Sequence, residues 1–258
     1  MFISGSIDTN SHIHLMMLNN QQVIFDSTSK LFLMMLFCHM VGCTQVYTPP
    51  EITDTIQQSV SSVVEGKSWW YYRVKVNRPK ETPPNWAMGA LVAGEVFSPI
   101  LENYRHDIEL WRFHRRAGRD QAGHQFSFIF YSSALTAQLI YYDLENNLLL
   151  RDLLQQGKLD SVQFDDVGQL SRPNLEDTSD KSWPLIIQKS WPDYIMGVSQ
   201  MWLNLVHGLA ENHQQVDVIQ RYDDVQKELT ALWMQYGQHA WLHHLNALYA
   251  YEPFLIRY

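Results

Sequence analysis

The chain has 258 residues and a formal net charge of −8 at pH 7, and 46% of its residues are hydrophobic. This length and composition are typical of a globular protein with a large core. The acidic balance argues against nucleic acid as a partner, because nucleic acids are bound through basic surfaces.

The first patterned segment is an apolar run, residues 31–41, which follows Lys30 and ends in Met40-Val41-Gly42-Cys43. The run is shorter than the ~20 residues that a helix needs to cross a bilayer. Cys38 and Cys43 are the two cysteines of the chain, so the residues after 43 form no disulfide with one another. The segment resembles the signal of a bacterial lipoprotein, in which Met40-Val41-Gly42-Cys43 is the lipobox and Cys43 is acylated and becomes the new N-terminus.

This resemblance implies a location in the bacterial cell envelope. Residues 1–43 are then an upstream start and a signal peptide, and the lipid on Cys43 holds the remaining chain on a membrane. Thr44, rather than Asp, follows the cysteine, which in this type of signal implies the outer membrane, with the protein facing the periplasm. The implied partners are the membrane itself and an envelope protein or cell-wall component. In the alternative interpretation, residues 31–41 form a buried core helix.

The next elements are a tether and a strand. Residues 44–66 begin with a polar, Pro-containing stretch and continue with weak helical spacing that predicts a short helix. Apolar residues then alternate with Tyr71, Arg73 and Lys75, and this period of two predicts a half-buried strand over 69–76.

A helix and a hairpin follow the first strand. Residues 85–100 have helical spacing, although their glycines weaken or kink the predicted helix. Residues 108–116 and 124–132 both alternate and are joined by a loop with Gly near its ends, which predicts a β-hairpin. Phe128 and its apolar neighbours on the second strand are expected to be buried against helices.

The remaining pattern completes a recognisable order of elements. The spacing predicts one helix over 134–156 and a short strand at 162–164. Residues 67–168 therefore read as strand, helix, strand, strand, helix, strand. This order predicts an α+β protein with the ferredoxin-like split βαβ arrangement (βαββαβ), in which helices cover one face of an antiparallel sheet.

The C-terminal segment, 169–258, is predicted to be helical and part of the same domain. Its apolar stripes favour helices over 194–210, 218–236 and 238–249 that pack on the open side of the sheet or on one another. A four-residue sequence ending in Trp183-Pro184 recurs eight residues later. We interpret the two copies as turns, the second of which starts a helix at residue 193; an aromatic pair that contacts a peptide or sugar is the alternative.

The hairpin contains the densest group of basic residues. Alternation places Arg112, His114 and Arg116 on one face of its first strand, while Arg119 lies in the loop and His124 begins the second strand. Because the guanidinium group matches carboxylates and phosphates, one hypothesis is a site for an anionic ligand, with or without catalysis. The other hypothesis is a solvated sheet face with no ligand.

The same region carries a resemblance at the level of pattern. The segments concerned are Trp69 to Val74, Trp111 to Arg116 and His124 to Phe128. Their layout is similar to that of the C-terminal domain of lantibiotic and thiopeptide dehydratases, over fewer than half of the residues. The resemblance implies the order of strands and helices over 69–165. We do not transfer the elimination chemistry of those domains, because they belong to much larger cytoplasmic chains, whereas the lipobox implies that this protein is exported.

A second group of residues has the spacing of a metal site. His239 and His243 are four residues apart on a predicted helix, which allows two imidazoles to bind one zinc ion. The glutamate of a zinc-protease motif is missing, and His207 and His213 are the only suggested third ligands, so we expect no metal and no cofactor. Without a nucleophile motif or a phosphate-binding loop, the sequence favours a non-enzymatic binding or accessory protein.

Overall fold

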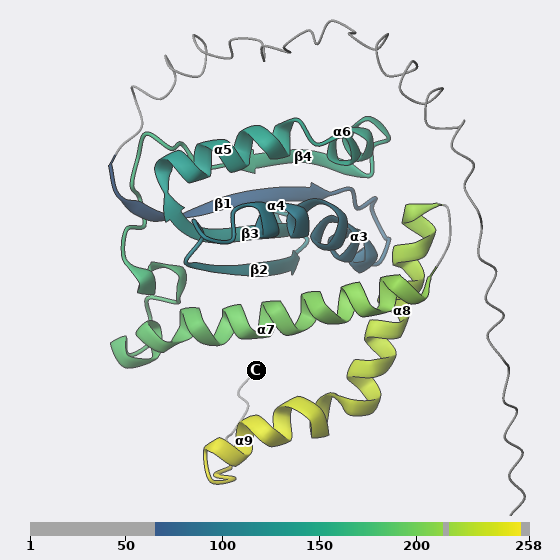
Figure 1. Cartoon of the computed structure of the whole chain (residues 1–258). Helices are drawn as coiled ribbons and strands as arrows, with labels where there is room; N and C mark the ends of the chain where they lie inside the picture. The colour runs from purple at the N-terminus through teal and green to yellow at the C-terminus, as the bar shows by residue number, and fades with distance from the viewer. Residues whose placement is uncertain (1–64, 214–216, 254–258) are drawn as a thin grey trace, which may run out of the picture. The chain divides into compact units, whose positions relative to one another are not determined.

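Four antiparallel strands form an open sheet in the order β2-β3-β1-β4 (Figure 1). They are β1 (Lys67–Val76), β2 (Leu110–Ala117), β3 (His124–Ser133) and β4 (Leu159–Phe164). The computed structural model describes residues 65–213 and 217–253. The lipobox, Cys43, the alternative core helix at 31–41 and nearly all of the segment 44–66 lie outside them. The prediction of an α+β protein with an antiparallel sheet and a C-terminal helical segment is confirmed.

The alternation of side chains along β1 shows which face of the sheet is buried. On one face every second residue of β1 is at most 2% exposed: Trp70, Tyr72, Val74 and Val76. In the register of the sheet, Tyr72 lies opposite both Phe128 of β3 and Phe164 of β4. Aromatic and β-branched residues suit such a pleated, covered surface, so this face forms the core of the molecule.

Two groups of helices cover that face. The first is a continuous helical stretch made of α3 (Trp86–Leu91), the π-helical η2 (Val92–Phe97) and α4 (Ser98–Asn103). The second is α5 (Ala134–Glu145) with α6 (Leu148–Gln155). Phe97 of η2 packs on Phe128, with ring centroids 5.2 Å apart, and Phe128 is fully buried, as the sequence predicted.

The single helix predicted over 134–156 is wrong, because it is interrupted between α5 and α6. Asn146 ends α5, and the side-chain oxygen of Asn147 accepts a hydrogen bond of 2.9 Å from the backbone N–H of Leu150. Asn competes well for such capping positions. The polar pair therefore starts a new helix where the apolar spacing alone suggested continuation.

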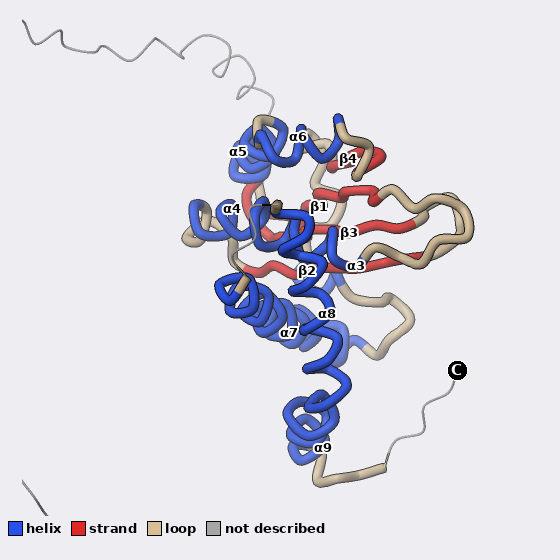
Figure 2. Tube along the Cα trace, turned by 90° about the vertical axis from the view of Figure 1, so that its right-hand side faces the viewer, coloured by secondary structure: helices blue, strands red, loops and turns tan. Residues whose placement is uncertain are grey.

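The C-terminal helices lie beside the sheet instead of on its open face. They are α7 (Leu185–Asn212), α8 (Val218–Gly237), the π-helical η4 (Gln238–His243) and α9 (His244–Leu248). Figures 1 and 2 show α7 running along β2, the edge strand. The hydroxyl oxygen of Ser199 accepts a hydrogen bond of 3.0 Å from the backbone N–H of Phe113. A helix thus covers an edge that could otherwise pair with another strand.

Helix α7 begins eight residues before the predicted start at residue 193. Pro192 lies inside the helix and is buried, although it provides no backbone N–H. The rings of Trp183 and Trp191 pack edge to face, with centroids 4.9 Å apart, across the start of the helix. Only the first of the two Trp-Pro pairs is therefore a turn; burial and aromatic packing stabilise the second within the helix.

Candidate functional site

The face of the sheet opposite the helices gathers basic side chains from two strands. The register places His114 of β2 opposite Ser127 of β3, which lies opposite Arg73 of β1. In the next row, Arg116, Gln125 and Lys75 are aligned in the same way. We call Arg73, Lys75, Arg112, His114 and Arg116 the basic face.

On β1, β2 and β3, this face carries no carboxylates. The side chains that share it on β1, β2 and β3 are Lys67, Trp69, Tyr71, Arg73, Lys75, Leu110, Arg112, His114, Arg116, Gln125, Ser127, Ile129, Tyr131 and Ser133. None is Asp or Glu, in a chain whose net charge is −8. Among the described ion pairs, Arg116 contacts Asp120 of the hairpin loop, and none includes Arg73, Lys75 or Arg112. Positive charge is therefore concentrated on one side of an acidic protein.

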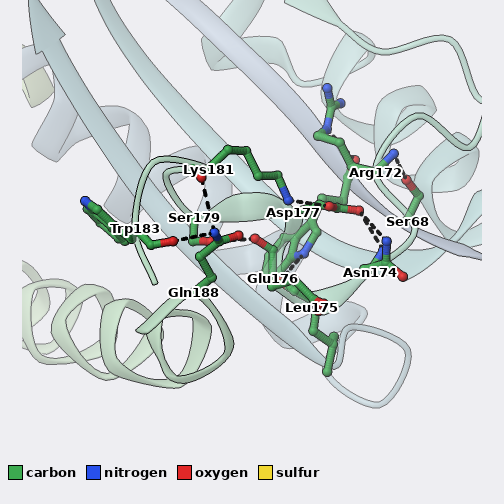
Figure 3. Close-up of polar contacts among 11 residues, drawn as sticks. Ser68, Arg172, Asn174, Leu175, Glu176, Asp177, Ser179, Lys181, Trp183 and Gln188 are labelled. Carbon is green, nitrogen blue, oxygen red and sulfur yellow. Dashed lines mark hydrogen bonds and ion pairs between the residues drawn. The ribbon is translucent and has the colours of Figure 1, made fainter. Parts of the chain in front are cut away.

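One end of the face is covered by residues 165–182, which we call the crossing segment; it contains the 3-10 helix η3 (Leu175–Thr178). The indole N–H of Trp69 donates to the carbonyl oxygen of Leu175 at 2.8 Å, and the hydroxyl of Tyr131 donates to that of Pro173 at 2.7 Å. Figure 3 shows how polar contacts within the segment hold its shape and link it to Ser68. The aromatic end of the open face is buried by this segment, whereas the C-terminal helices α7 and α8 pack on one another and α7 packs on the edge strand β2.

Arg112 lies where the crossing segment meets the basic face. Its Nε and Nη2 donate to the hydroxyl and carbonyl oxygens of Thr178, at 2.8 and 3.3 Å. Burial lowers the pKa of Arg112 below its ordinary value, although the group stays charged. Two of the five donors of the guanidinium are thus used to fix its orientation.

Tyr71 is contacted by two guanidinium groups. The Cζ atom of Arg73 lies 4.4 Å from the ring centroid, and that of Arg172, from the crossing segment, lies 4.2 Å from it. Arg172 also forms an ion pair with Asp165, whose carboxylate accepts from the backbone N–H of Tyr71 at 2.9 Å. The ring holds Arg73 by cation–π attraction and leaves its charge without an acidic partner on the strands.

The pKa of His114 is shifted by the groups around it. His114 is exposed, but neighbouring atoms displace part of its hydration, and this desolvation and then the positive charges of Arg112, Arg116 and Arg73 lower its pKa from the ordinary value of 6.5. The imidazole is therefore neutral at pH 7, and an anion bound among these groups would favour its charged form.

His124 does not lie with these residues, so its assignment to the same site is wrong. It is 4% exposed and shares the core face with Phe126. Its ring nitrogens are 2.9 and 3.0 Å from the carbonyl oxygens of Arg116 and Asn85, and Trp86 packs edge to face on the ring. His124 therefore connects the hairpin to the residue that caps α3.

The other predicted site residues are also placed elsewhere. Arg119 is exposed in the hairpin loop, where it donates to the carbonyl oxygen of Thr82 at 3.4 Å. His239 and His243 lie in η4, and their rings stack with centroids 5.3 Å apart. Within the described residues, no group of three or more His, Cys, Asp or Glu is arranged to hold a metal ion.

Sequence reasoning did not include Arg73 and Lys75 in the site. Alternation did place both on the polar face of their strand, but only the register shows that this strand lies one strand away from the hairpin's basic residues. The approach of Arg172 from the crossing segment had no periodic signal to reveal it.

Comparisons with known proteins give no further guide to the site. No protein-family model matches the chain, and no curated protein or solved structure is significantly similar to it. In the described part of the chain, no helix combines the length and apolar character required to span a bilayer.

Proposed function

We propose that this protein is a non-enzymatic, lipid-anchored component of the bacterial envelope whose basic face binds an acidic surface of a partner protein or an anionic cell-wall component. The observation that carries the proposal is the alignment of Arg73, Lys75, His114 and Arg116 across three strands that contribute no carboxylate to that face. Complementary charge of this kind steers association and fixes the orientation of a partner.

The shape of the site supports a large partner over a small ligand. The five cavities described in the structure are lined by other residues, and none includes Arg73, Lys75, His114 or Arg116. Small-molecule and catalytic sites are usually concave. The alternative is an enzyme or small-anion binder that uses the Arg/His cluster, and none of these five cavities lies at that cluster.

The finer topology is part of the proposal. We infer the ferredoxin-like split βαβ arrangement from the order βαββαβ, the strand order β2-β3-β1-β4 and the two helical groups on one face. In this arrangement the second face of the sheet is available for binding.

The anchor is proposed from the sequence of the lipobox. Acylation of Cys43 supplies membrane affinity that an acidic domain lacks, and the tether that follows gives the domain reach from the outer membrane into the periplasm. The lipobox resemblance supports this location, and the basic face supports a partner there.

Binding can be tested with a fluorescent Glu-rich peptide as a defined acidic probe. The double variant Arg73→Glu, Arg116→Glu should weaken binding at least tenfold at low salt, and added salt should weaken binding to the unaltered protein. Lys189→Glu, an exposed charge reversal on α7, is compared with Arg73→Glu alone, which changes the net charge by the same amount. Equal binding by Arg73→Glu and Lys189→Glu would remove the basic face from the function.

A further inference from the structure

A cleft between α7 and α8 lies apart from the basic face and shares no residue with it. It has a volume of about 490 Å³ and is lined mainly by apolar side chains, including four tryptophans: Trp86, Trp202, Trp233 and Trp241. Small-molecule sites typically have this size and a mainly apolar lining with a few polar groups.

One wall of the cleft depends on a glycine and on a change of helix type. The rings of Trp233 and Trp241 are stacked, with centroids 5.5 Å apart and an angle of 10° between their planes. A Cβ atom on Gly237 would lie 3.0 Å from the Trp233 ring and 3.3 Å from the Trp241 ring. The π-helical turn of η4 follows directly, and its wider turn brings residue 241 over the same side as residue 233.

Gln226, Thr230 and Arg115 are the polar residues that line the cleft, and Arg115 is the charged one. The Cζ atom of Arg115 lies 5.2 Å from the ring centroid of Trp86 and 4.9 Å from that of Trp202. Its Nη2 donates to the carbonyl oxygen of Trp86 and to Gln226 Oε1, the latter at 3.2 Å. Burial lowers the pKa of Arg115 to about 10. None of the ion pairs in residues 65–213 and 217–253 includes it.

The charge of Arg115 and the apolar lining of the cleft together indicate the chemical class of a ligand. A desolvated cation without a counter-ion is costly, and a carboxylate that enters the cleft removes that cost. Both of the hydrogen bonds of Arg115 leave from Nη2, and Nε lies against Gly89 of α3, so the donors of Nη1 remain for a ligand. Flat aromatic walls, in turn, suit an apolar chain or ring system.

We propose that the cleft binds a small amphiphilic carboxylate, with its apolar part between the tryptophans and its carboxylate hydrogen-bonded to Arg115. The apolar lining supplies the affinity, and Arg115 supplies the preference for an acid over a neutral analogue of the same length. The proposal does not depend on the basic face, which lies on a different surface of the sheet and contains other residues.

The test compares two probes that differ in the head group. Isothermal titration calorimetry of the full-length protein should show saturable binding of one dodecanoate, measured below its micelle concentration. Dodecanol should bind at least tenfold more weakly. Equal affinity for the two probes, or no saturable binding of dodecanoate, would overturn the proposal.

Variants locate the site. Val198→Trp fills the cleft and should weaken dodecanoate binding at least tenfold, whereas Ile186→Trp, on an exposed position of the same helix, should not. Arg115→Gln should reduce the preference for dodecanoate over dodecanol to near one; where this variant does not fold, the two probes on the unaltered protein decide. Arg73→Glu should leave dodecanoate binding unchanged. Loss of binding in Ile186→Trp equal to that in Val198→Trp would contradict the assignment.

Discussion

Arg73 of β1 and His114 of β2 lie in one row of the sheet, separated by Ser127 of β3, and each is paired with that serine in the register. A small residue between them leaves their side chains free to approach a common ligand. The row also explains why Arg73 is among the charges that lower the pKa of His114. This relationship joins two strands that are distant in sequence into one electrostatic surface.

The first prediction concerns the pH dependence that follows. The pKa of His114 is lower in the folded protein than in the unfolded chain, so the unfolded chain binds more protons just below pH 6.5. The stability that neutral His114 contributes is therefore present above pH 6.5 and is lost as the pH falls further. An acidic partner favours protonated His114, so its binding should strengthen as the pH falls from 7 towards ~5.5. NMR titration of His114 with and without the Glu-rich peptide measures both effects.

The control for this prediction is His114→Gln, which keeps a polar side chain without a titration in this range. It should bind the peptide with an affinity that changes less between pH ~7 and ~5.5. An unchanged pH dependence in this variant would assign the effect to another group.

A second prediction separates binding from stability on the basic face. Arg112→Ala leaves Thr178 without its two hydrogen bonds and should lower the free energy of unfolding by about 1–3 kcal/mol. Arg73→Ala should change it by less than about 0.5 kcal/mol, since Arg73 lies on an open face. Both should weaken peptide binding. Chemical denaturation and peptide titration of the two variants provide the measurements. A larger loss of stability in Arg73→Ala than in Arg112→Ala would contradict the contact between Arg112 and the crossing segment.

A third prediction tests the core. Phe128 is fully buried between Phe97 and Phe130, with ring centroids 5.2 and 4.9 Å away. Phe128→Ala should therefore lower the free energy of unfolding by about 3–5 kcal/mol. Leu148→Ala, at a position that is 80% exposed, should change it by less than about 0.5 kcal/mol. Urea denaturation of both variants decides, and similar midpoints would contradict the assignment of the two faces.

A fourth prediction tests the anchor. Cys43→Ser removes the thiol that acylation requires, so the protein should leave the membrane fraction, while Cys38→Ser should remain in it. Mass spectrometry of the unaltered protein should show a lipid-modified N-terminus at Cys43. An intact chain with residues 1–43 unprocessed would instead favour the core-helix interpretation of the apolar run.

The sequence was informative where side chains repeat with a regular period. The alternation of β1 and of the hairpin strands predicted which residues face the helices, and it grouped Arg112, His114 and Arg116 correctly on one face of β2. It could not show which strands are neighbours, since register depends on contacts between residues as far apart as Arg73 and Ser127. For this reason the site appeared as part of one hairpin, although it extends over three strands.

Other features lacked any periodic signal. The crossing segment is fixed by single hydrogen bonds to distant residues, such as that from Trp69 to Leu175, and its polar composition resembles a loop. The error over His124 had a different origin, because its alternation placed it with Phe126 on the core face while its chemistry suggested a ligand site. Both ring nitrogens face backbone carbonyl oxygens, so a buried histidine can serve as a connection between elements.

The last prediction concerns the contact that places α8, and with it one wall of the tryptophan cleft. Gly94 of η2 lies against the hydroxyl of Tyr222, and a Cβ atom there would be 2.3 Å from that oxygen. The hydroxyl is 2.9 Å from Glu95 Oε1, to which it donates. Gly94→Ala should therefore lower the free energy of unfolding by about 1–3 kcal/mol through overpacking. This cost is larger than the opposing gain of ~0.5–1 kcal/mol that alanine provides over glycine inside a helix.

The double variant with Tyr222→Phe provides the specific test. Removing the hydroxyl leaves ring carbon Cζ, at 3.1 Å from the added Cβ, as the nearest atom, so part of the clash disappears. Tyr222→Phe alone loses the hydrogen bond to Glu95 and should cost about 1–2 kcal/mol. Because the two residues are in contact, Gly94→Ala should cost less in the Tyr222→Phe background than in the unaltered protein, by at least about 0.5 kcal/mol. Additive losses in thermal or chemical denaturation would show that Gly94 does not set the approach of α8.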